Sequence, residues 1–102
     1  MDLDTLRNHI RRGAFFVTDH AITEGVKDGI TVADMIRVIE TGKIIERYPE
    51  RHRCLIYGRS NDGLPIHVVI DYRARRSVDI VTTYVPQREQ WIRNRVRKRK
   101  KR

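Results

Sequence analysis

Apolar residues recur three and four positions apart through the first 41 residues, which is the spacing of a buried helical face. This pattern predicts a helix from Leu3 that ends at Gly13, a second helix that ends near Gly29, and a third over residues 31–41. The third helix begins with the residue spacing of a capping box. Between the first two helices, the apolar run 14–17 is too short to distinguish a strand from a loop.

Polar and apolar residues alternate in the second half of the chain, as in strands that bury one face. The alternation and its Gly and Pro breaks predict four strands, over residues 43–48, 53–59, 64–72 and 78–85. The sequence Asn-Asp-Gly at 61–63 is a strong turn signal between the second and third strands. Such short links join antiparallel neighbours, so we expect a meander in chain order. Pro86 is expected to open a last helix around Trp91.

Helices that precede a sheet in the sequence should cover one of its faces. We therefore predict an α+β domain in which the N-terminal helices pack on one face of a four-stranded antiparallel meander, followed by the C-terminal helix and a basic tail. With 102 residues, of which 39% are hydrophobic, the chain has enough apolar surface for one modest core. The domain is expected to span residues 1–96 and the tail residues 97–102.

The basic residues are concentrated toward the C-terminal end. The formal net charge is +9, from 22 basic and 13 acidic residues. Eight of the basic residues lie within 93–102, so the rest of the chain is nearly neutral. A run of like charges stays solvated and attracts phosphate backbones without reading a base sequence. The same run is equally typical of an end that only improves solubility.

No apolar run is long enough to span a membrane, and residues 1–4 lack the features of a signal peptide. Cys54 is the only cysteine, so no internal disulfide is expected, and we interpret Cys54 as a structural thiol. These observations predict a cytoplasmic protein with no membrane partner. No zinc-site spacing of Cys and His and no Gly-rich phosphate loop is present, so we expect no metal and no cofactor.

Several short segments carry a family resemblance. They are His20-Ala21, Gly29–Thr31, Gly42–Pro49, Leu64–Val69 and Val81–Pro86, followed by Trp91. In these segments the chain resembles the bacterial domain-of-unknown-function family 4258, over residues 18 to 95. The resemblance implies a small α/β domain similar to the RelE-type ribonuclease toxins. It also implies a toxin–antitoxin or related conflict system, with RNA as the substrate and a small acidic antitoxin protein as the partner.

The chain departs from the family at two positions. Relatives usually carry arginines four and eight positions after the first histidine of the pattern, whereas this chain has Glu24 and Asp28 there. If those arginines hold phosphate in the relatives, that role is absent here. The departure weakens the expectation of nuclease activity.

His67 is the leading candidate for acid or base catalysis. Metal-independent RNA cleavage needs a base near the 2′-hydroxyl, an acid for the leaving oxygen, and cations on the phosphate. Strand alternation places His67 on the other face of the sheet from the aliphatic Ile66 and Val68. Because the aliphatic face should pack against the helices, we expect His67 on the open face. An ordinary half-buried strand histidine would show the same pattern. His20 and Tyr84 are candidate catalytic helpers, although capping and packing roles also fit them.

The candidate phosphate contacts are arginines of the predicted strands and of the basic turn after the third strand. They are Arg47, Arg53, Arg59, Arg73, Arg75 and Arg76. Arginines are also common on the solvated edges of strands. Together with His67 and the family resemblance, they lead us to expect a toxin-like ribonuclease that uses no metal.

Two other classes of protein stay open. A non-catalytic RNA- or protein-binding module would use the basic tail as its main contact. A DNA-binding helix-turn-helix over the second and third helices is the less favoured alternative. The third predicted helix of the chain would be the recognition helix, and its polar side carries Asp34, Arg37 and Glu40. This set is nearly neutral and would attract DNA phosphates only weakly.

Overall fold

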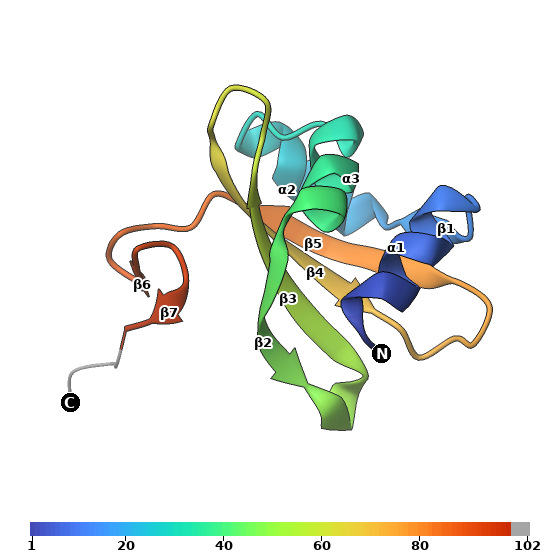
Figure 1. Cartoon of the computed structure of the whole chain (residues 1–102). Coiled ribbons are helices and arrows are strands. Elements are labelled where there is room, and N and C mark those ends of the chain that lie inside the picture. Colours follow the sequence, from blue (N-terminus) through green and yellow to red (C-terminus); the bar gives the residue numbers. More distant parts are fainter. Residues whose placement is uncertain (99–102) are drawn as a thin grey trace.

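The computed structural model describes residues 1–98 and contains a mixed five-stranded sheet, three helices and a two-stranded C-terminal hairpin (Figure 1). The helices are α1 (Leu3–Arg11), α2 (Asp19–Lys27) and α3 (Val32–Thr41), with a short 3-10 turn, η1 (Pro49–Arg51). The strands of the sheet are β1 (Phe15–Val17), β2 (Lys43–Tyr48), β3 (Arg53–Arg59), β4 (Pro65–Asp71) and β5 (Val78–Tyr84). The hairpin consists of β6 (Trp91–Ile92) and β7 (Val96–Arg97).

Each α-helix begins at a residue whose side chain caps its first turn. Asp2, Thr18 and Thr31 each accept a hydrogen bond from the backbone amide three residues later. At Thr31 the predicted capping box is confirmed, because the Asp34 carboxylate also accepts a hydrogen bond from the Thr31 amide at 2.9 Å. None of the helices within residues 1–98 has the length and apolar character needed to cross a lipid bilayer.

The sheet has the strand order β1-β5-β4-β3-β2. Strands β2 to β5 pair antiparallel in chain order, as the short links predicted. The prediction of a purely antiparallel four-stranded sheet is nevertheless wrong, because β1 adds a fifth strand parallel to β5, with Phe16 opposite Asp79. A strand of three residues is too short to show alternation, so its pattern did not distinguish it from a loop.

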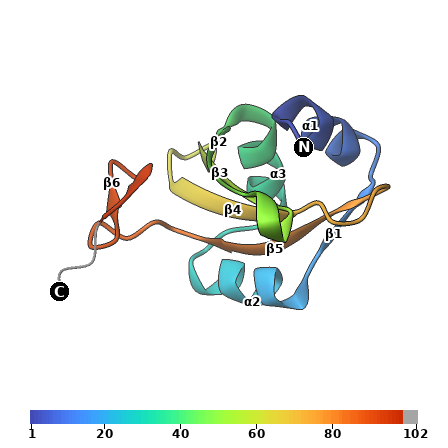
Figure 2. The same ribbon diagram turned by 90° about the horizontal axis from the view of Figure 1, so that it is seen from below.

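The core lies between the helices and one face of the sheet. Along β4, Ile66, Val68 and Ile70 all belong to the buried apolar cluster that includes residues of all three helices. Helix α2 lies along β5, and α3 packs over β3 and β4 (Figure 2). Helices α1 and α3 lie on the face of the sheet that carries the core, whereas α2 lies along β5, where Thr18 and Asp28 at its two ends bond to the backbone of Val81 and Val85 (Figure 2). His67 and its neighbours lie on the opposite face of β4.

The predicted C-terminal helix is wrong, because this segment forms the β6–β7 hairpin. The hairpin buries only Trp91, which is 3% exposed, whereas Ile92 and Val96 are exposed. A helix stabilised by packing would have to place several apolar residues on one face, and this segment has too few. The hairpin instead buries the one large aromatic residue of this segment, Trp91.

Three residues, 93–95, connect the two strands of the hairpin. Arg93 and Asn94 both adopt left-handed backbone conformations, with φ of 50° and 64°. Asn tolerates this region better than most residues, and these two residues are the centre of a turn in which the Arg95 amide donates to the Ile92 carbonyl oxygen at 3.0 Å. The expected basic tail, 97–102, begins inside this hairpin with Arg97, and residues 99–102 lie outside the described part of the chain.

Candidate functional site

His67 lies on the sheet face opposite the helices, as the alternation along β4 predicted. It is fully buried, however, so the expectation of an open, accessible histidine is wrong. The C-terminal hairpin covers this part of the sheet and sets the Trp91 ring against the imidazole, with ring centroids 4.4 Å apart and an interplanar angle of 88°. No periodic pattern in the sequence indicated that the segment after Pro86 folds back over the sheet.

Both ring nitrogens of His67 have hydrogen-bond partners. Nε2 lies 2.5 Å from the backbone carbonyl oxygen of Asn94, in the hairpin turn. A carbonyl can only accept, so Nε2 carries the hydrogen and donates it. Nδ1 is then free to accept from the Tyr84 hydroxyl, which lies 3.3 Å away. This pattern is that of a neutral imidazole protonated on Nε2, which agrees with the lowered pKa of His67.

His67 is the centre of an aromatic row that crosses three strands. Tyr57 on β3 and Tyr84 on β5 are its direct cross-strand partners, and both rings pack edge-on against the imidazole. We call these three residues and Trp91 the histidine cluster. Burial lowers the pKa of His67 and raises the pKa of Tyr84 to about 12, so neither group changes protonation readily near neutral pH.

A polar network ties the hairpin to the edge strand β2. The Arg97 guanidinium forms an ion pair with Glu46 at 3.2 Å and lies over the Trp91 ring, 4.5 Å from its centroid. The Tyr48 hydroxyl donates to the same Glu46 carboxylate. These contacts hold Trp91 in place over the buried imidazole.

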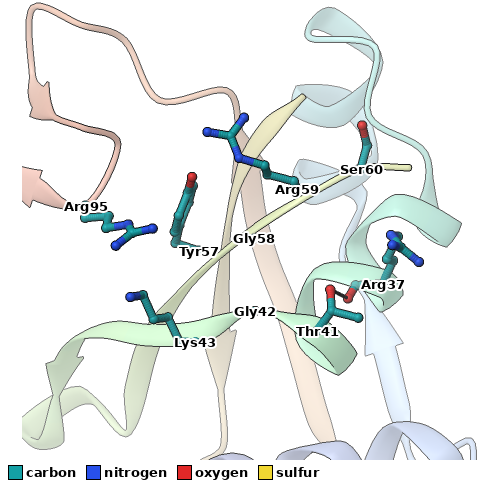
Figure 3. A pocket seen from close by; sticks show the side chains of 9 residues that line it. All are labelled: Arg37, Thr41, Gly42, Lys43, Tyr57, Gly58, Arg59, Ser60 and Arg95. Atoms are coloured by element: carbon teal, nitrogen blue, oxygen red, sulfur yellow. Dashed lines mark hydrogen bonds between the residues drawn. The ribbon is translucent and has the colours of Figure 1, made fainter. Parts of the chain in front are cut away.

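A cationic cavity of about 350 Å³ adjoins the histidine cluster at Tyr57. We call it the basic pocket. It is lined by Arg37, Thr41, Gly42, Lys43, Tyr57, Gly58, Arg59, Ser60 and Arg95, as Figure 3 shows. Four cationic side chains reach it from α3, β2, β3 and the hairpin, and none of the lining residues is acidic. Its chemistry suits an anion that accepts several hydrogen bonds.

Two glycines form the floor of the basic pocket, where α3 crosses β3. A Cβ atom on Gly42 would overlap the Tyr57 carbonyl oxygen, and one on Gly58 would lie 3.2 Å from the Val38 Cα. Only residues without a side chain permit this close approach of helix and strand. The two glycines therefore place Arg37 and Lys43, on either side of the end of α3, around the same cavity.

The C-terminal end of α3 would by itself disfavour an anion, because helix carbonyls point outward there. Arg7 of α1 counters this effect. Its guanidinium donates hydrogen bonds to the carbonyl oxygens of Ile39 and Gly42, both at 2.9 Å. The end of α3 thus carries a positive group where it borders the pocket.

The structure does not bring the six predicted arginines together. Arg59 alone lines the basic pocket. Arg53 forms an ion pair with Asp71 at 3.0 Å, four residues along β4 from His67, or about 13 Å along the strand. Arg47 donates to the Met1 carbonyl oxygen. The exposed arginines of the β4–β5 turn are at the same distant end of the sheet, and they are Arg73, Arg75 and Arg76.

His20 also lies apart from the histidine cluster. Thr18, at the start of α2, contacts Val81 through its hydroxyl, whereas Asp28, just beyond the end of α2, accepts from the Val85 amide at 2.8 Å. His20 is exposed in the first turn of α2, and Tyr84 lies beside the far end of that helix. The two helper candidates are therefore separated by the length of α2.

Glu24 and Asp28, where the resemblance led us to expect arginine, lie beside Tyr84. Glu24 and Asp28 line a cavity of about 280 Å³ with Tyr84 and three other residues. Glu24 is paired with Lys27 at 3.1 Å, and Asp28 links α2 to the end of β5. The cavity beside Tyr84 has no cation among its lining residues, in contrast to the basic pocket beside Tyr57.

Sequence reasoning missed four residues of the basic pocket that matter for its chemistry: Arg37, Lys43, Tyr57 and Arg95. They come from four different elements, so no spacing along the chain groups them. Within residues 1–98, His, Cys, Asp and Glu side chains form no group of three or more that could hold a metal ion.

These features define a small α+β protein that carries a cationic pocket next to a buried histidine. The chain belongs to the family described as "Domain of unknown function (DUF4258)", whose model matches residues 17–85. Comparison with curated proteins and with solved structures gave no significant match. The matched segment includes His67 and most of the basic pocket, but the hairpin with Trp91 and Arg95 lies beyond it.

Proposed function

We propose that this protein binds RNA and that the basic pocket seats a phosphate of the bound strand. The observation that carries the proposal is the convergence of four cations from four elements on one cavity without a carboxylate in its lining. Cations that contact phosphates release counterions, which supplies affinity independent of base sequence. Guanidinium groups add directional, charge-assisted hydrogen bonds to the phosphate oxygens.

Two further features support RNA as the ligand. Of the eight basic residues within 93–102, Arg95 lines the pocket, and Arg93, Arg97 and Lys98 lie in or next to the same hairpin, so positive charge continues beyond the pocket. The family resemblance, whose most specific part covers the His67 and Tyr84 strands, implies a similarity to the RelE-type ribonuclease toxins, and this implication favours RNA over DNA. A flexible single strand presents its phosphates to a concave site more readily than a stiff duplex does.

The test is binding of a fluorescent single-stranded RNA, measured by polarisation over a range of salt concentrations. A double variant, Arg37→Gln with Lys43→Gln, should weaken binding about tenfold or more and lower the salt slope by about 0.7 for each phosphate that the protein no longer neutralises. The matched control, Arg75→Gln with Arg76→Gln, removes the same charge from the distant turn. Equal decreases in affinity for the two variants would show that only net charge matters and would refute the pocket.

A second candidate function is metal-independent RNA cleavage of the toxin type, with His67 and Tyr84 as the catalytic groups. One observation favours it: the His67 ring packs 5.9 Å from the ring of Tyr57, which lines the basic pocket. A phosphate held there would lie close to the histidine cluster. The hairpin would first have to leave, because His67 has no exposed surface. A small acidic antitoxin would then compete with RNA for the cations of the pocket.

Cleavage of a mixed RNA substrate by the full chain, His67→Gln and Tyr84→Phe tests this second function. If His67 is the acid or base, its replacement should lower the rate about 10²–10⁴-fold while leaving RNA affinity unchanged. Folding of each variant is checked by circular dichroism. Binding without cleavage by the wild-type chain would exclude the ribonuclease and leave the binding function standing.

A further inference from the structure

We infer that the basic pocket binds the terminal phosphate of an RNA, a phosphomonoester, in preference to an internal phosphodiester. The inference rests on the proposed RNA binding and specifies which phosphate the pocket takes. It is carried by the charge of the pocket, by the number of phosphate oxygens that can face its lining, and by the hydrogen-bond donors that its lining residues leave free.

The charge of the pocket matches a dianion better than a monoanion. A phosphomonoester carries close to two negative charges at neutral pH and has three unsubstituted oxygens. A phosphodiester carries one charge and has only two such oxygens. Arg37, Lys43, Arg59 and Arg95 surround the cavity without an acidic residue in its lining, so a diester would leave most of this positive charge uncompensated.

The pocket is an open concavity, and its chemistry still favours a chain end. Its lining comes from the end of α3, the start of β2, the β3–β4 region and the hairpin, and its floor is closed where Gly42 and Gly58 bring α3 against β3 (Figure 3). An internal phosphate carries a ribose on two of its oxygens and can turn only the other two toward these elements. A terminal phosphate can turn three oxygens toward them at once.

The lining also retains donors after its internal hydrogen bonds are made. Ser60 Oγ accepts from the Leu64 amide at 3.0 Å, which leaves its hydroxyl hydrogen to donate. Arg59 donates to the Gly63 carbonyl oxygen at 2.7 Å through Nη1, which orients the guanidinium while its other nitrogens remain. Thr41 differs, because its hydroxyl donates to the Arg37 carbonyl oxygen at 2.8 Å. We therefore assign the phosphate contacts to the four cations and Ser60.

The experiment compares one short RNA in three forms: with a 5′-phosphate, with a 3′-phosphate, and with hydroxyls at both ends. Affinities for the full chain are measured by competition against an internally labelled RNA. One of the phosphorylated forms should bind about tenfold more tightly than the hydroxyl form, and the end that shows this gain identifies the source of the monoester. Lys43→Gln and Ser60→Ala should remove the gain, whereas Arg75→Gln should keep it.

The two proposals fail in different ways. Equal affinity for all three forms would overturn the terminal-phosphate inference and leave RNA binding intact. A gain that persists in Lys43→Gln and in Ser60→Ala would also overturn it, because the phosphate would then bind elsewhere. Absence of binding to every form would refute the RNA proposal and the inference with it. Thermal denaturation checks that each variant is folded.

Discussion

Replacing His67 with phenylalanine should destabilise the protein even though the ring volume is nearly kept. Phenylalanine cannot donate to the Asn94 carbonyl or accept from the Tyr84 hydroxyl, so both partners lose their hydrogen bond. Each buried polar group left without a partner costs about 1–3 kcal/mol. Because Asn94 and Tyr84 are only half-buried, water replaces part of the loss. We expect a decrease of about 2–4 kcal/mol in the free energy of unfolding.

The cost of this replacement should depend on pH. Burial lowers the pKa of His67 in the folded protein below its ordinary value of 6.5. Between the folded pKa and 6.5, the unfolded chain binds more protons, so acidification favours unfolding of the wild type. The stability that this histidine contributes is complete above pH 6.5 and is lost as the pH falls through the folded pKa. His67→Phe lacks this dependence, so the difference between the two proteins should shrink in acid.

Urea unfolding at neutral pH and at about pH 5 measures both effects. The fluorescence of Trp91, the only tryptophan, reports the hairpin, and circular dichroism reports the sheet. The control is His20→Phe, because His20 is exposed and should tolerate the change within about 0.5 kcal/mol. A loss below about 1 kcal/mol for His67→Phe, or a loss that stays constant between the two pH values, would refute the assigned hydrogen bonds.

Two other substitutions, the first with a matched control, test the packing around the site. Gly42→Ala should lower the free energy of unfolding by about 3 kcal/mol or more, because the new Cβ overlaps the Tyr57 carbonyl oxygen. The control is Gly63→Ala, whose Cβ meets no atom, so it should cost only about 1–2 kcal/mol for its positive φ. Urea unfolding measures both losses. Trp91→Ala should release the hairpin and weaken RNA binding through the loss of Arg95 from the pocket, while the sheet stays folded. Hydrogen exchange would then show protection lost in β6 and β7 alone, and loss throughout the sheet would contradict this expectation.

Local signals predicted most of the fold, because they are complete within a few residues. Three such signals are the capping box at Thr31, the turn at 61–63 and the alternation along β4. Each predicts its local structure without any contribution from distant residues. Strand β1 and the C-terminal hairpin follow from tertiary contacts instead. Val17 and its neighbours become a strand by pairing with β5, and Trp91 is buried by docking on His67.

The candidate site was less predictable for the same reason. Alternation placed His67 on the correct face, but its accessibility depends on a segment that begins 19 residues later in the sequence, at Pro86. Arg59 was the only predicted phosphate contact that lines the basic pocket. The other three cations of the pocket meet there because Gly42 and Gly58 let α3 approach β3 and because the hairpin folds back. Neither the close approach of α3 to β3 nor the docking of the hairpin produces a periodic pattern of residues in the sequence.

The hairpin couples the histidine cluster to the basic pocket, and this coupling favours binding over cleavage. Asn94 holds His67 through its carbonyl, and the next residue, Arg95, lies over the Tyr57 ring, 5.3 Å from its centroid, and lines the pocket. A phosphate that contacts Arg95 would therefore stabilise the docked hairpin, by as much as it binds that state more tightly than the undocked one. Cleavage by His67 requires the opposite state, with the hairpin displaced. The same ligand that fills the pocket should thus keep the imidazole covered, so RNA binding is the function that this arrangement supports best.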